Sequence, residues 1–146
     1  MLTQYHIEIM LASLGGRFSP RAMSVIIQAN VGQDRLAGQV GHDEFHFDNN
    51  AFEKTYAYIE EQRALVVSSL RSDDANSAWQ AFGSLLHTAQ DFYAHSNYIT
   101  LWVDRFDPST GSGQAALPPP PEVDPLDPSL IHSPDLRSGK VYFPLE

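Results

Sequence analysis

The chain has 146 residues, a formal net charge of −9 and no cysteine. This length suits one domain, and the absence of cysteine excludes disulfides, thiolate metal sites and a cysteine nucleophile. The negative charge argues against long-range attraction to nucleic acid, and no apolar run reaches the length of a membrane span. Strong nucleic-acid binding and a transmembrane segment are therefore not expected.

Two helices are predicted first. The apolar segment 2–14 stops at a pair of glycines, which is typical of a helix end. It lacks the basic cluster and the uninterrupted apolar run of a signal peptide. Ser19 and Pro20 then predict an N-cap followed by proline in the first turn of a second helix. The apolar stripe of that helix consists of Met23, Ile26, Ile27 and Val31.

Two longer helices are predicted after an irregular stretch. Residues 32–41 are expected to form a loop, and residues 42–50 an ordered, irregular segment with many potential ligands. A third helix is predicted over 51–70, with its apolar side made of Phe52, Tyr56, Ile59, Val66, Val67 and Leu70. A fourth follows capping candidates at 72–74 and extends to residue 97, with Trp79, Phe82, Leu86 and Ala89 as its core face.

The composition changes after Phe106. Most of the ten prolines fall between residues 107 and 134, which excludes regular helix there. The expectation is an all-α, compact domain of four to five helices over 1–106. An extended, Pro-rich tail is expected over 107–146, with a short strand possible at its more apolar end.

His87, Asp91 and His95 follow one another at spacings of four, inside the fourth predicted helix. Residues four apart share one helix face, so imidazole, carboxylate and imidazole stack in one column. The column spans about 12 Å, which is long for a single ion. The spacing therefore suggests two metal ions that share Asp91, a geometry suited to phosphoester hydrolysis. A solvated polar face, or buried groups with ordinary hydrogen bonds, would produce the same pattern.

Further nitrogen and oxygen ligands lie in two other segments. His6 belongs to the first helix, although a histidine without metal is an equally simple interpretation there. His42, Asp43, Glu44, His46 and Asp48 crowd one loop. In an extended conformation His46 and Asp48 would point the same way, with Phe47 turned towards the core. Three segments could therefore converge on one metal cluster.

One stretch resembles a known family. Leu85-Leu-His-Thr-Ala-Gln-Asp-Phe-Tyr-Ala-His-Ser-Asn-Tyr98 is similar to the signature of the Het-C (heterokaryon incompatibility) family and of related animal proteins that contain a von Willebrand factor A domain. Residues 45–49 and 3–8 resemble the His-Phe-Asp segment and the N-terminal histidine helix of that family. The family is distantly similar to the all-helical zinc-dependent phospholipases C and single-strand nucleases.

The resemblance implies a zinc-type phosphoester hydrolase with a carboxylate-bridged cluster. Its metal ligands would be His6, His46, Asp48, His87, Asp91 and His95. A metal-bound water would attack phosphorus, with Asp48 or Glu44 as general base. Two zinc ions are expected, because no second His-x-x-x-Asp/Glu motif follows Asn97 to complete a third site. Tyr93 and Asn97 could contact the substrate, a small phosphoester or a phospholipid headgroup.

Three alternatives stay open. An HD-type phosphohydrolase would use His42, Asp43 and Asp91. A ferritin-like di-iron bundle lacks the Glu-x-x-His pair it needs. In a different class, the domain would be a non-catalytic recognition or cell-death module with a structural or vestigial metal site.

Overall fold

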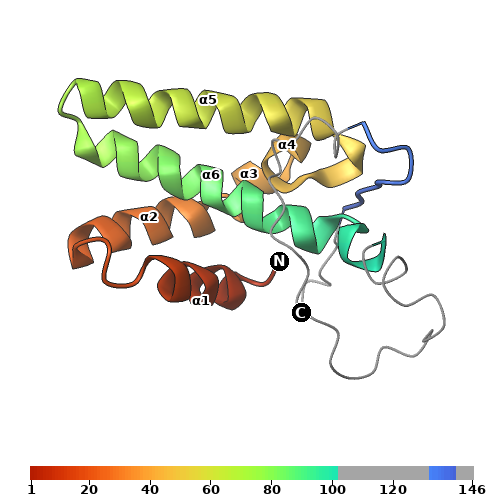
Figure 1. The fold of residues 1–146 in the computed structure, drawn as a ribbon, viewed down its shortest axis with the longest axis horizontal. Helices are drawn as coiled ribbons and strands as arrows, with labels where there is room; N and C mark the ends of the chain where they lie inside the picture. The colour runs from red at the N-terminus through yellow and green to blue at the C-terminus, as the bar shows by residue number, and fades with distance from the viewer. Residues whose placement is uncertain (102–131, 141–146) are drawn as a thin grey trace.

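The computed structural model describes residues 1–101 and 132–140, which form an all-α domain (Figure 1). The long helices are α1 (Thr3–Leu14), α2 (Pro20–Gly32), α5 (Phe52–Arg71) and α6 (Ala75–His95). The short ones are α3 (Leu36–Gln39), α4 (Asp43–His46) and the 3₁₀ helix η1 (Asp48–Asn50). The described residues contain no β-strand, only an isolated antiparallel bridge between Ser96 and Ser138. The predicted fold class is confirmed.

Helix α6 is the central element of the domain. It lies between α5 on one side and α2 with α1 on the other (Figure 1). One core cluster, built around Phe47, Phe92 and Ile59, lies on the α5 side, and a second, built around Met10 and Ile26, lies between α1, α2 and α6. Two faces of α6 are therefore buried, and a polar group on it can be shielded from water. None of the described helices combines the length and the apolarity that crossing a bilayer requires.

The predicted helix starts correspond to real caps. The Ser19 hydroxyl accepts a hydrogen bond from the backbone N–H of Ala22 at 3.2 Å, and Pro20 occupies the first turn of α2. The Asp74 carboxylate accepts from the N–H of Ser77 at 3.0 Å at the start of α6. Both side chains satisfy N–H groups that have no partner within the helix.

Four local predictions need correction. The loop predicted over 32–41 contains α3, and the irregular segment 42–50 contains α4 and η1. Helix α6 ends at His95 rather than at residue 97. The predicted apolar side of the third helix is buried in its first half, but Val67 and Leu70 are about half exposed, at 47% and 56%. The physical reason is that the described helices that pack extensively on α5 are α6 and α4, and they leave these two side chains about half uncovered.

The segment 132–140 returns to the helical domain. Leu136 is buried in the core cluster around Phe47 and Phe92. The backbone N–H of Gly139 donates to the carbonyl oxygen of His95 at 3.0 Å, so the segment is held at the C-terminal end of α6. Of the strand predicted near the end of the chain, only the Ser138 bridge lies among the described residues. The predictions for 107–131 and 141–146 fall outside them.

Candidate metal centre

The side chain of Asp91 lies at the centre of a buried polar cluster. Its Oδ2 is 3.0 Å from His46 Nδ1 and 3.1 Å from His87 Nε2, and those two nitrogens are 3.0 Å apart. Its Oδ1 is 3.3 Å from His6 Nε2 and 3.7 Å from His95 Nε2. Asp91, His6, His46 and His87 are almost completely buried. The His87–Asp91–His95 column of the sequence is thus real, and its two histidines face different oxygens of one carboxylate.

An unusual backbone conformation delivers ligands from residues 46–50. Phe47, Asn49 and Asn50 have positive φ angles of 56°, 51° and 59°. Such angles are uncommon for residues other than glycine, above all for a bulky one. The turn sends Phe47 into the core, where it packs edge-on to Phe92, while His46 contacts Asp91 and Asp48 contacts His95. The sequence predicted that His46 and Asp48 point the same way because the segment is extended. In the structure their directions instead follow from the end of α4 and the left-handed conformation of Phe47.

The outer nitrogens of three histidines are held by hydrogen-bond acceptors. His46 Nε2 lies 3.3 Å from the carbonyl oxygen of Gly38. His6 Nδ1 lies 2.6 Å from Oε1 of Gln90, and His95 Nδ1 lies 2.7 Å from Oδ1 of Asp48. A carbonyl or carboxylate oxygen can only accept, so each outer nitrogen carries the proton. In a neutral ring the inner nitrogen then presents a lone pair towards Asp91.

Gln90 fixes the orientation of the His6 ring from two directions. Its Nε2 donates to the backbone oxygen of His6 at 3.2 Å, and its Oε1 also accepts from Nδ2 of Asn30 at 3.1 Å. Among the described residues, the fully buried Nε2 of His6 has no hydrogen-bond partner. The His6 ring is further held by stacking on His87, with ring centres 4.3 Å apart. The Nε2 of His6 is therefore held in place, buried, 3.3 Å from Oδ1 of Asp91.

Opposing effects set the charge of the cluster. Burial raises the pKa of Asp91, but the imidazoles around it, above all the hydrogen bond from His46, outweigh burial and hold that pKa well below its usual range. Burial lowers the pKa of His46, yet the hydrogen bond and the charge of Asp91 raise it more, so the net shift is upward. For His87, burial dominates and its pKa is lowered. Asp91 is thus ionised, and His87 is a neutral, ligand-ready imidazole.

Two residues near the centre were missed by the sequence interpretation. Asp34 lies after α2, and its Oδ1 is 3.6 Å from His87 Nε2. One ligand atom each from Asp34, His46, His87 and Asp91 all lie within 4.8 Å of one another. Lys140 donates to the backbone oxygen of Gln39 at 2.9 Å and lies 3.5 Å from Asp48 Oδ2. Neither belongs to a spacing motif, and only folding brings them to the site.

Several predicted site residues make contacts other than the expected ones. Glu44, predicted as a catalytic base, lies 2.8 Å from Nδ1 of His42 instead of facing Asp91. Asp48 reaches the centre only through His95. The Asn97 side chain binds the backbone of the returning segment, donating to Asp135 O at 3.0 Å and accepting from Arg137 N at 2.8 Å. Tyr93 packs with Phe92 and Tyr98 against the core. His132, given no role from sequence, is exposed.

Fold and site together define an all-helical domain with a buried histidine–aspartate centre. The family model described as the VWA7 N-terminal domain matches residues 5–111, and the chain belongs to this family. The match includes Asp91 and all of the histidines around it.

The relatives found are much longer proteins. The chain is 31% identical over 98 residues to the rat protein "von Willebrand factor A domain-containing protein 7". This match covers 64% of the chain. It is 32% identical over 80 residues to the human protein of that name, which covers 55% of this chain. The chain spans about a tenth of the length of these curated relatives, 11% and 9% respectively. No solved structure matches it.

These comparisons correct the functional expectations. The assignment to the Het-C family was wrong, because the family found is that of the VWA7 N-terminal domain. The predicted phosphoester hydrolase of phospholipase C or nuclease type rested on that assignment and is wrong as well. The same holds for the predicted Het-C-like recognition or toxin module. No relative's name indicates a hydrolase or zinc. What stands is the geometry of the centre, which the structure describes independently of any family.

Proposed function

We propose that this domain binds a divalent metal ion between His46 Nδ1, His87 Nε2 and Asp91 Oδ2, with Asp34 at the open side. The observation that carries the proposal is the proton arrangement. The outer nitrogen of His46 donates to Gly38, so in the neutral ring the inner nitrogen is a lone pair 3.0 Å from His87 Nε2 and 3.0 Å from Asp91 Oδ2. Protons cannot satisfy all three close pairs of such a triangle, whereas one cation satisfies them together.

The distances suit a small transition-metal ion. Two ligand atoms bound at about 2.1 Å in a tetrahedral site lie roughly 3.4 Å apart. The separations among His46, His87 and Asp91 are 3.0 Å to 3.1 Å, Asp34 lies 3.6 Å from His87, and all four ligand atoms lie within 4.8 Å of one another. Nitrogen and carboxylate ligands without thiolate suit zinc and its first-row neighbours. Such an ion would link α6 to α4 and to the segment after α2, so its first role is to stabilise the domain.

The other oxygen of Asp91 supports a second position. His6 Nε2 and His95 Nε2 face Oδ1, and their outer nitrogens are held by Gln90 and Asp48. An acceptor behind each imidazole is the usual outer shell of a metal ligand. The same carboxylate therefore offers ligands for a second ion on this side.

With His46, His87 and Asp91 as its ligands, a tetrahedral ion would keep its fourth position open towards solvent. Asp34, the most exposed of the four residues at 19% of its side chain, lies on that side. An oxygen of a small phosphoester or phospholipid headgroup is the ligand we expect there, as binding without turnover. Titrating inorganic phosphate into the metal-loaded chain measures this, and absence of any heat or shift would remove this part of the proposal.

Metal titration of the chelator-treated chain tests the site. Calorimetry with Zn²⁺, Mn²⁺ and Mg²⁺, with elemental analysis for stoichiometry, should show tight binding of the transition metals and little of Mg²⁺. Co²⁺ should give a visible absorption band typical of low coordination number. At 100 times the dissociation constant, the ion should stabilise the fold by about 2.7 kcal/mol.

Variants decide which residues hold the ion. Asp34→Asn and His87→Gln should weaken Co²⁺ binding and alter its spectrum, with circular dichroism confirming that both fold. His42→Gln is the matched control, because His42 is 43% exposed and lies against Glu44. Absence of Co²⁺ or Zn²⁺ binding by the folded chain would overturn the proposal, as would binding that is unchanged in both variants.

A further inference from the structure

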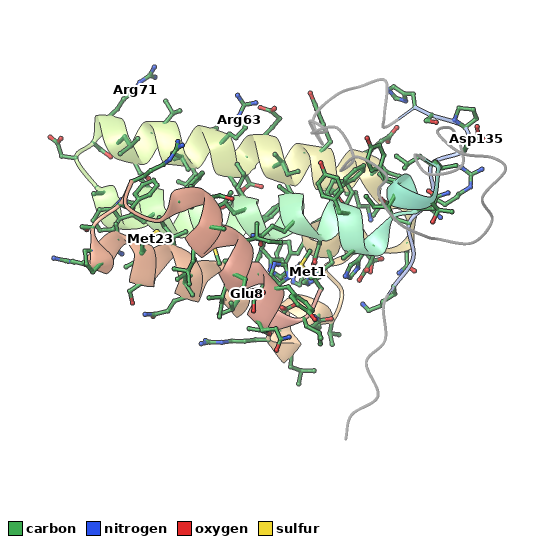
Figure 2. The ribbon with its side chains drawn as sticks, turned by 60° about the horizontal axis from the view of Figure 1, so that its bottom comes forward. Met1, Glu8, Met23, Arg63, Arg71 and Asp135 are labelled. Atoms are coloured by element: carbon green, nitrogen blue, oxygen red, sulfur yellow. The ribbon has the colours of Figure 1, made fainter. Side chains whose placement is uncertain are left out.

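The outer face of α5 carries a stripe that none of the described elements covers. Glu60, Ala64, Val67 and Arg71 line one side of a groove of about 640 Å³, and Phe82 and Leu85 of α6 contribute to it. Val67 is 47% exposed. In Figure 2 the labelled side chains of Arg63 and Arg71 project outward from α5, away from the other helices. An apolar strip with charged ends is typical of a helix–helix contact surface.

The four residues of this stripe share one helix face. Their spacings are four, three and four, the pattern by which one helix meets another along a seam. The order along the stripe is acid, small, branched, base. The intrahelical pair of Glu60 with Arg63 at 2.9 Å is about half exposed on both sides, so it contributes little and leaves Glu60 able to exchange partners.

We propose that α5 packs antiparallel against α5 of a second copy of this chain across this stripe. Positions 60 and 71 lie equally far from the midpoint between 65 and 66, as do 64 and 67. An antiparallel pair therefore places Glu60 opposite Arg71 of the second copy, and Ala64 opposite Val67 of the second copy. Each contact occurs twice, as two-fold symmetry requires.

The charges on the stripe favour a second copy of the chain as the partner and an antiparallel arrangement of the two α5 helices. A parallel arrangement would set Glu60 against Glu60 and Arg71 against Arg71, which is unfavourable. Antiparallel pairing gives two opposite-charge contacts at the ends and two small-against-branched contacts in the middle, where Ala64 leaves space for Val67. The chain as a whole is acidic at −9, so two copies attract only where such local pairs exist. The proposal does not depend on the metal centre.

The expected association is weak, because one helix face buries less area than a standard interface. Sedimentation equilibrium of the full chain over about 5 to 500 µM should fit a monomer–dimer equilibrium with a micromolar dissociation constant. Val67→Glu should raise that constant at least about tenfold, since it buries an unpaired carboxylate. Chelator should leave the equilibrium unchanged.

Charge reversal supplies the decisive arm of the experiment. Glu60→Arg alone and Arg71→Glu alone should each weaken the dimer, and the double variant should restore it, because each reversed charge again meets its opposite. Matched controls are Leu65→Glu and Glu61→Arg, which alter an exposed leucine and a neighbouring acid on another side of α5. A monomer at all concentrations would overturn the proposal, as would a dimer that is indifferent to Val67→Glu or a double variant no better than the single ones.

Discussion

His46 and His87, 41 positions apart in the chain, bring their Nδ1 and Nε2 atoms to 3.0 Å. One residue ends α4, and the other lies in the middle of α6. Both nitrogens also contact the same oxygen of Asp91. In the metal-free chain a proton on His46 can bridge to Asp91, in keeping with the raised pKa of His46. A metal ion would replace that proton and join the three groups.

The Gln90 side chain should matter for metal affinity although it is no ligand. It holds His6 through a 2.6 Å contact and a 3.2 Å bond to the His6 backbone. Gln90→Leu should lower affinity for the ion on the Oδ1 side of Asp91 about 10- to 100-fold, the usual cost of losing such a partner. Calorimetry measures it. Gln90→Glu, which keeps the acceptor, should retain most of the affinity, and the exposed Gln28→Leu should have no effect.

Lys140 places a positive charge beside Asp48, and this charge would repel a second metal ion bound nearby. Its Nζ lies 3.5 Å from Asp48 Oδ2 and 3.9 Å from Asp43 Oδ1. Lys140→Met should therefore strengthen binding of a divalent ion near His95, by roughly three- to tenfold. Elemental analysis and calorimetry at matched metal concentrations report the change. Lys140→Arg keeps the charge and should behave as wild type; weaker binding by Lys140→Met would contradict this account.

Close contact between α2 and α6 depends on Gly83. A Cβ added there would meet the backbone oxygen of Ile26 and lie 2.9 Å from Cβ of Ala29. Since the obstacle is backbone, the helices would have to separate, and Gly83→Ala should destabilise the domain by about 1–3 kcal/mol. Urea unfolding measures it. Gly32→Ala, with open space around the new methyl group, is the control and should be neutral or slightly stabilising.

The cap of α6 predicts a pH effect remote from the centre. Hydrogen bonds from the Ser77 side chain and backbone lower the pKa of Asp74 below its ordinary value of 3.8. A lowered pKa means that this stabilisation is present above pH 3.8 and is lost as the pH falls through the folded-state pKa. Wild type should therefore lose stability relative to Asp74→Asn below about pH 3.8. Parallel unfolding curves for the two proteins at all pH values would show that the cap does not titrate in this way.

The sequence predicted the column on α6 because the column depends only on the spacing of nearby residues along one helix. Helical periodicity alone places His87, Asp91 and His95 on one face, and the structure has them there. The contribution of residues 46 and 48 was predicted for a different reason than the actual one. A left-handed conformation at Phe47 cannot be inferred from alternation, because it depends on the core that receives the phenyl ring.

The apolar side of α5 shows what periodicity cannot predict. Periodicity shows that Val67 and Leu70 can face a neighbour, but not whether a neighbour is present. The partner of Glu44 could not be inferred for a similar reason, since its contact with His42 depends on the side-chain conformation and not on chain spacing.

By itself the sequence determined the four long helices, the caps of α2 and α6 and the ligand column, since each depends on residues within a few positions of one another. Only the tertiary structure decided that Asp34, His46 and His6 meet Asp91, because those contacts require α1, α2 and α4 to pack on α6. The same packing removes water from Asp91, and this burial is the reason why we propose a cation among otherwise ordinary polar residues.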